Sequence, residues 1–195
     1  AIDLYEENLG DRFSGLTPYQ RLRILYARRR DFDNAIRVCA ARGAPLRIVG
    51  TGPDDSRLRS LAGPEVRFDG WLSPEALREA YRECRALIQA HEEDFGIAPV
   101  EAMAAGRPVV ALAKGGASEV VTSECGVLYD DPTDAGLAAA LATFEGLSFD
   151  SEELRRRSLH FSREAYRERM TDALVRATER FASRDGAPFP LDQLK

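Results

Sequence analysis

The chain has 195 residues, of which 44% are hydrophobic and 30% are charged, and its formal net charge at pH 7 is −5. This length supports one well-packed domain, and the balance of apolar and charged residues excludes a disordered chain. The acidic net charge argues against a nucleic-acid-binding protein, because such proteins are usually basic.

No apolar run approaches the roughly 20 residues that a membrane-spanning helix needs. Residues 1–7 have neither the basic nor the apolar region of a signal peptide. The three cysteines, Cys39, Cys84 and Cys125, lie far apart and form no CxxC pair. This pattern is typical of small core residues in a reducing compartment. We therefore expect a cytoplasmic protein whose cysteines are structural.

Residues 1–21 show no hydrophobic period and are interpreted as an interdomain-type linker, with Gly10, Gly15 and Pro18 as breakers. Apolar runs and helical spacings then alternate along the chain. The apolar runs predict strands at 22–27, 45–50, 66–68, 86–90, 108–112 and 126–129. The segments around them predict helices at 31–42, 54–62, 74–81, 99–105, 132–144, 151–159 and 162–183.

This alternation predicts an α/β fold, namely a Rossmann-like parallel sheet of about six strands with helices on both faces. We assign residues 22–183, including the C-terminal helices, to this domain and residues 184–195 to a tail. Ligands of such sheets bind beyond the carboxyl ends of the strands. The candidate loops are therefore 28–30, 51–53, 69–72, 91–98 and 113–117.

The segment HEEDFGIAPVEAMAAGRPVV, residues 91–110, follows a predicted strand at this edge. Gly96 has no Cβ, so the backbone there can approach a ligand closely. Pro99 suits the first position of a helix, whose N-terminal amides stabilise an anion such as a diphosphate. Glu101 would then lie in the first helical turn, where its carboxylate could accept hydrogen bonds from a ribose diol. Glu93, on the preceding loop, would face the space for a sugar.

The Glu93–x7–Glu101 spacing within EDFGIAPVEAMAAGRPVVA resembles the EX7E signature of retaining GT4-type glycosyltransferases, and most of all their mannosyltransferase-like branch. The resemblance continues in PLRIVGTGPDDSRLRSLAG and VRFDGWLSPEALREAYRECRALI before the signature and in KGGASEVV after it. It covers about residues 22–130. It implies one half of a GT-B fold, the C-terminal domain that binds the nucleotide-sugar donor.

The resemblance also implies a role for each matching residue. Glu101 would bind the ribose hydroxyls, and Glu93 would contact the donor sugar or assist near the reacting carbon. The other donor-binding residues that it implies are Asp94, Phe95, Gly96 and Ile97 at the sugar and diphosphate, and Gly52, Pro53, Phe68 and Trp71 around the nucleoside.

Members of the family place two cations after the first strand to neutralise the diphosphate. If LRILYA, residues 22–27, is that strand, Arg28 and Arg30 take these roles. The sequence PYQR at 18–21 offers a second register, in which Gln20 replaces a cation. Two guanidiniums and a helix N-terminus can stabilise a departing nucleoside diphosphate, so the resemblance implies catalysis without a metal ion or other cofactor.

The resemblance implies that the N-terminal acceptor domain is missing and that this chain alone transfers little sugar. The amphipathic helix 162–181 resembles the C-terminal helix that reaches back across the cleft in the family. The expected partners are a nucleoside-diphosphate sugar, the missing domain and a glycan or lipid acceptor, with peripheral membrane contact through the missing half. The branch suggests GDP-mannose as the donor, with UDP sugars as the alternative.

Other interpretations stay open. A non-catalytic nucleotide-sugar sensor or subunit would carry the same motif. An NAD-dependent oxidoreductase is disfavoured, because the GTGP turn at 50–53 lacks a third glycine and follows the second predicted strand. Taken alone, Glu93 and Glu101 would be ordinary solvated charges. Trp71 would either stack on a base or close a loop, and a direct role for His91 is left open.

Overall fold

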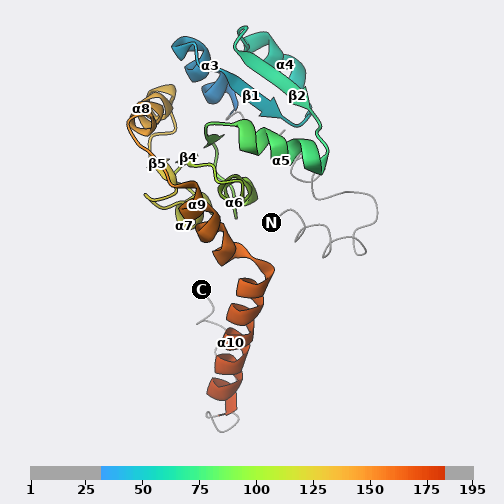
Figure 1. The fold of residues 1–195 in the computed structure, drawn as a ribbon, viewed down its shortest axis with the longest axis vertical. Coiled ribbons are helices and arrows are strands. Elements are labelled where there is room, and N and C mark those ends of the chain that lie inside the picture. Colours follow the sequence, from blue (N-terminus) through green and yellow to red (C-terminus); the bar gives the residue numbers. More distant parts are fainter. Residues whose placement is uncertain (1–31, 183–195) are drawn as a thin grey trace. The chain divides into compact units, whose positions relative to one another are not determined.

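A computed structural model describes residues 32–182 of the chain. From residue 32 to residue 145 helices and strands alternate along the sequence, and only helices follow, as Figure 1 shows. The chain divides into two compact units, the first ending at Ser158 and the second beginning at Leu159. The linker boundary near residue 21 and the tail from residue 184 lie outside the described residues.

The elements of the first unit follow the predicted order closely. Its strands are β1 (Leu46–Val49), β2 (Val66–Gly70), β3 (Leu87–Gln89), β4 (Val109–Leu112) and β5 (Gly126–Tyr129). Its helices are α3 (Phe32–Arg42), α4 (Asp55–Leu61), α5 (Pro74–Glu83), α6 (Ile97–Ala104), α7 (Ala117–Val120), α8 (Asp134–Glu145) and α9 (Ser151–Ser158).

The strands form two parallel sheets, in which β1 pairs with β2 and β4 lies between β3 and β5. The prediction of one sheet of about six strands is therefore wrong for residues 32–182, which contain five strands in two sheets. The predicted strand at 22–27 lies outside the described residues.

Helices cover both faces of the three-stranded sheet. One buried cluster joins α3 and α8 to the sheet and contains Ala35, Val38, Ala90, Val110, Leu112, Tyr129, Leu137, Ala140 and Phe144. Because side chains alternate along a strand, Val109 and Ala111 lie on the opposite face, where α6 and α7 contact β4. The central strand is buried along its whole length, which explains its unbroken apolar sequence.

Polar contacts fix α3 against the start of α8. Nε of Arg37 donates to Oδ2 of Asp134 at 2.6 Å, and Nδ2 of Asn34 donates to the carbonyl of Pro132 at 2.6 Å. These contacts are exposed, so each adds little stability by itself. Their role is to set the position of α3, whose first residue, Phe32, lies beside the candidate site.

Two helix starts differ in how well the sequence predicts them. Helix α5 begins as expected, with Pro74 in its first turn and Ser73 accepting a hydrogen bond from the amide of Ala76 at 3.2 Å. Helix α6 begins at Ile97, two residues before the predicted start at Pro99. The predicted position of Glu101 in the first turn is therefore wrong, and it lies in the second.

The second unit contains a short 3-10 helix, η1 (Leu159–Phe161), and α10 (Arg163–Ala182). The predicted helix over 162–183 is thus confirmed. Tyr166, Met170 and Leu174 recur at every fourth residue of α10 and are 41% to 61% exposed. This spacing places them on one helical face. Within residues 32–182, no helix combines the length and the apolar character needed to cross a membrane.

Gly126, the first residue of β5, lies too close to β4 to carry a side chain without displacing backbone atoms. A Cβ built on Gly126 lies 1.9 Å from the carbonyl oxygen of Val109, whereas one built on Gly146 comes no closer than 3.6 Å to another atom. We expect Gly126→Ala to lower the free energy of unfolding by about 3 kcal/mol, since backbone atoms must move. The control Gly146→Ala should change it by less than about 1 kcal/mol. Urea unfolding followed by circular dichroism measures both, and equal effects would contradict the close approach.

Candidate functional site

The loops that follow β3 and β4 meet beyond the ends of these strands. Glu93 and Gly115 form a parallel β-bridge, and the amide of Gly116 donates to the carbonyl of Glu93 at 2.7 Å. The pairing of β3 with β4 therefore continues into the segment that carries the predicted signature. This contact lies at the carboxyl edge of the sheet, where α/β proteins bind ligands.

Glycine is required where these loops touch. A Cβ on Gly115, whose φ is +59°, would lie 2.2 Å from the carbonyl oxygen of Glu93. A Cβ on Gly116 would lie 2.2 Å from the carbonyl oxygen of Phe95. Real atoms do not approach so closely, so a side chain at either position would push the loops apart. The KGG sequence at 114–116 thus fixes the backbone of Glu93 to Phe95.

The loop after β3 leads directly into the N-terminus of α6. Gly96 is buried, has a φ of +82° and occupies the N-cap position. Ile97 is the first helical residue, and Pro99, in the first turn, has no amide to leave unpaired. The preceding residues Asp94 and Phe95 are exposed. Free amides and the positive end of the helix can bind an anion at this position.

The Glu93 side chain contacts a buried histidine. Nε2 of His91 lies 3.3 Å from Oε2 of Glu93, and the His91 residue is only 7% exposed. The ring of Phe32, at the start of α3, lies 6.2 Å from the imidazole ring between centroids. Strand β3, the following loop and α3 thus jointly hold the first glutamate of the signature.

Glu101, the second glutamate of the signature, is bound to a tyrosine on a different helix. The hydroxyl of Tyr81 on α5 donates to Oε2 of Glu101 on α6 at 3.0 Å. Burial raises the pKa of Glu101 to about 7, although the Tyr81 hydrogen bond acts in the opposite direction. Sequence reasoning missed Tyr81, because its proximity to Glu101 arises from the packing of α5 on α6 and leaves no local pattern.

The end of α5 is held in place close to Tyr81. Nη2 of Arg107, just after α6, donates to the carbonyl of Arg82. Sγ of Cys84 donates to the carbonyl of Tyr81 at 3.1 Å. Both contacts satisfy carbonyls in the last turn of α5, which a helix leaves without partners. They fix the backbone from which Tyr81 reaches Glu101.

The other predicted donor-binding residues follow β1 or lie in and after β2. Gly52 and Pro53 form the turn between β1 and α4. Phe68 lies within β2 rather than in a loop, and the guanidinium carbon of Arg59 lies 4.5 Å from its ring centroid. Trp71 directly follows β2 and is 58% exposed. No hydrogen bond described for residues 32–182 joins Trp71 to the Glu93–Glu101 segment.

A buried aspartate between Phe68 and Trp71 escaped the sequence analysis. The side chain of Asp69 is 3% exposed, and Nε of Arg47 donates to its Oδ2 at 2.8 Å. Burial alone would raise the pKa of Asp69, but hydrogen bonds from Arg47 and Arg67 outweigh it and lower the pKa. The carboxylate is therefore ionised and holds β2 to β1 beside the predicted nucleoside loops.

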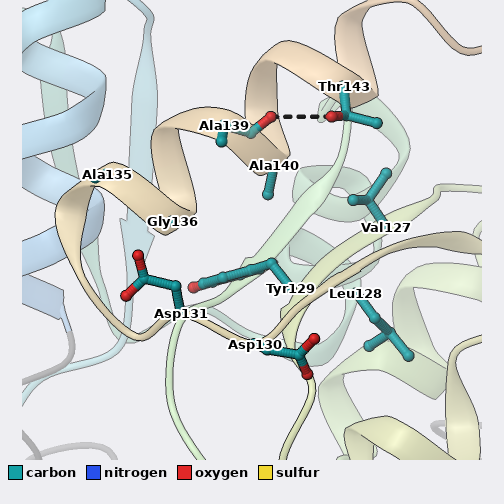
Figure 2. Close-up of a pocket in the computed structure, with 10 residues that line it drawn as sticks. All are labelled: Val127, Leu128, Tyr129, Asp130, Asp131, Ala135, Gly136, Ala139, Ala140 and Thr143. Carbon is teal, nitrogen blue, oxygen red and sulfur yellow. Dashed lines mark hydrogen bonds between the residues drawn. The ribbon is translucent and has the colours of Figure 1, made fainter.

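Arg28 and Arg30 lie outside the described residues. In the part of the chain from Phe32 to Ala182, no group of three or more His, Cys, Asp or Glu side chains is placed to hold a metal ion. A hollow of about 440 Å³ lies between β5 and α8, as Figure 2 shows. It is lined by Tyr129, Asp130 and Asp131 and by small residues of α8, and it includes none of the predicted site residues.

The sequence and the fold both resemble known glycosyltransferases. Residues 29–144 match the family described as Glycosyl transferases group 1. A D-inositol 3-phosphate glycosyltransferase of Acidothermus cellulolyticus is 31% identical over 162 residues, which cover 74% of this chain and 36% of that protein. The chain therefore spans only about a third of that relative's length.

Among solved structures, sucrose-phosphate synthase from Thermosynechococcus elongatus aligns with a TM-score of 0.66 and 24% identity over 78% of this chain and 43% of that chain. Anabaena HepE, solved in complex with UDP and glucose, aligns with a TM-score of 0.58 and 21% identity over 72% of this chain and 44% of that chain. These likenesses establish the α/β architecture of a GT-B half. Because the family match covers more than half of the sequence, the chain belongs to the group 1 glycosyltransferases.

Proposed function

We propose that this chain is the donor-binding domain of a retaining glycosyltransferase of the GT4 type. It binds a nucleoside-diphosphate sugar at the carboxyl edge of the β3–β4–β5 sheet. A second, N-terminal domain binds a glycan or lipid acceptor, and sugar transfer requires both halves. The partial coverage of longer relatives supports this division.

The observation that carries the proposal is the placement of Glu101. Its partly buried carboxyl belongs to the helix whose N-terminus follows the Glu93–Gly115 bridge, and no ion pair with a described residue compensates this burial. A carboxyl buried without a countercharge costs stability, and such groups gather at functional sites. An anion site one turn away from a carboxylate matches the diphosphate and the ribose diol of a nucleotide sugar.

The roles of the site residues follow from this placement. Glu101 accepts hydrogen bonds from the ribose hydroxyls, and the backbone from Asp94 to Ile97 holds the sugar and the diphosphate. Glu93, fixed by its backbone, contacts the donor sugar near the reacting carbon. Gly52, Pro53, Phe68 and Trp71 flank the nucleoside.

The charge on the leaving group is neutralised without a metal ion in this proposal. Arg28 and Arg30 supply two cations, and the positive end of the α6 dipole adds a partial positive charge. The donor sugar is mannose if the mannosyltransferase-like resemblance extends to specificity. HepE was solved with UDP, so uridine nucleotides form the alternative donor class.

Donor binding can be measured by calorimetric titration of the 195-residue chain with GDP-mannose, UDP-glucose, GDP, UDP and NADH, without added metal. We expect one nucleoside diphosphate and its sugar to bind. Glu101→Ala should weaken this binding by at least about thirtyfold, because a hydrogen bond to a charged group is lost. Glu168→Ala, on the exposed face of α10, is the matched control and should change nothing.

A 2′,3′-dideoxy form of the bound nucleotide identifies the contact. It should bind the unaltered chain weakly, and Glu101→Ala should weaken it no further, since the two changes remove the same hydrogen bonds. Additive losses would place Glu101 elsewhere in the site. Binding of NADH alone would instead favour an oxidoreductase.

The burial of Glu101 also predicts a pH-dependent stability. Its pKa rises from 4.5 to about 7 on folding, so the ionised form destabilises the fold increasingly from pH 4.5 upwards and fully above pH 7. Glu101→Gln keeps an oxygen that can accept from Tyr81 and removes the charge. We expect this variant to exceed the unaltered chain in unfolding free energy by about 3 kcal/mol at pH 8.5 and to match it at pH 4.5. Urea unfolding at both pH values measures the two unfolding free energies. A difference between the variant and the unaltered chain that is the same at both pH values would contradict the prediction.

A further inference from the structure

We propose that Tyr81 is a positioning residue of the donor site, whose hydroxyl holds the partly buried Glu101 carboxyl in the orientation that receives the nucleotide ribose. This inference rests on the proposed donor-binding function and adds a residue to it. Tyr81 itself touches no donor in this proposal. It acts through Glu101, and its loss should therefore change the pH at which the chain binds its donor.

The geometry supports a positioning role because the hydrogen bond joins two separate helices. The Tyr81 hydroxyl, in the last turn of α5, lies 3.0 Å from Oε2 of Glu101, in the second turn of α6. Arg107 and Cys84 fix the α5 backbone within this turn, at the carbonyls of Arg82 and Tyr81. A tyrosine hydroxyl held in this way restricts the rotation of the Glu101 carboxyl before the nucleotide binds. This reduces the conformational entropy that is lost on binding.

The Tyr81 hydroxyl binds one carboxyl oxygen of Glu101, and in this proposal the other oxygen binds the nucleotide ribose. The Tyr81 hydroxyl donates to Oε2, and within residues 32–182 no hydrogen bond to Oε1 is described. A ribose diol presents two hydroxyl groups that donate hydrogen bonds, and an ionised carboxylate can accept several hydrogen bonds. The ionised form of Glu101 is therefore the form that binds the diol best.

The charged side chains of the elements packed against α6, including Arg78, Glu79 and Arg82 of α5, do not act on the Glu101 carboxyl among the described residues. Strands β3 and β4 contain no ionisable residue, and the guanidinium of Arg155 on α9 lies against Gly106, beyond the other end of α6. The ionisable residue of α7 is Glu119, which has no resolved effect on Glu101. Among the described residues, Tyr81 is the group whose hydrogen bond favours the ionised carboxyl of Glu101.

This arrangement makes donor affinity depend on pH near neutrality. Because the pKa of Glu101 is about 7, a falling pH protonates the carboxyl and weakens donor binding. Removing the Tyr81 hydroxyl raises that pKa further, since the ionised form loses a hydrogen bond. The affinity should then decline from a higher pH than in the unaltered chain.

The experiment is a series of calorimetric titrations of the whole chain with UDP and with GDP from pH 5.5 to 9. The variants are Tyr81→Phe, Glu101→Gln and the matched control Tyr166→Phe, whose side chain is exposed on α10. For a pKa rise of about one, Tyr81→Phe should weaken binding about five- to tenfold at pH 6.5 and by no more than about threefold at pH 9. Glu101→Gln should bind weakly and keep only the pH dependence of the nucleotide's own terminal phosphate, and Tyr166→Phe should follow the unaltered chain.

A ligand-free measurement separates this inference from the proposed function. NMR titration of the Glu101 side-chain carbon should give a higher pKa in Tyr81→Phe than in the unaltered chain. If the unaltered chain binds a nucleotide but Tyr81→Phe leaves both the pH profile and the carboxyl pKa unchanged, the role of Tyr81 is overturned. If the unaltered folded chain binds neither nucleotide at any pH, the donor-site function is overturned, and the role of Tyr81 in donor binding falls with it.

Discussion

The backbone contact between the loops after β3 and β4 sets the geometry of the candidate site. The Glu93 carbonyl accepts from the Gly116 amide at 2.7 Å, and the chain passes so close that neither Gly115 nor Gly116 can carry a side chain. The contact fixes the direction in which the chain enters Gly96 and thus the axis of α6. Because Glu101 lies on that helix, a loop contact near the first glutamate of the signature also places the second.

The position of the Glu101 carboxyl on α6 also depends on a second helix, α5. Packing of α5 on α6 buries Glu101 and at the same time supplies the Tyr81 hydroxyl. Burial of a lone carboxyl opposes folding, whereas the hydrogen bond recovers only part of that loss. A fold selected for stability alone would place an apolar residue here. In the proposed donor site, the ribose of the ligand would complete the hydrogen bonds of this carboxyl.

The parts of this site that could be predicted are those encoded by neighbouring residues. The start of α5 follows from Ser73 and Pro74, and the buried β4 follows from an unbroken apolar run. The start of α6 was misplaced because proline is tolerated throughout the first turn, so Pro99 marks that turn without marking its first residue. Helix α7 has four residues, too few to show a period. Tyr81 and Asp69 were missed because their partners come from other elements, which only packing brings together.

The charge balance of the candidate site bears on how it could bind a diphosphate. Residues 92–101 contain Glu92, Glu93, Asp94 and Glu101, whereas the N-terminus of α6 contributes roughly half a positive charge. A diphosphate brought beside these carboxylates meets net repulsion unless guanidinium or ammonium groups are close. The carboxylates suit the hydroxyl-bearing parts of a nucleotide sugar, and the amides alone suit its phosphates. In the proposed donor site, Lys114 in the loop beside Glu93 and the two arginines Arg28 and Arg30 are the cations that would offset this repulsion.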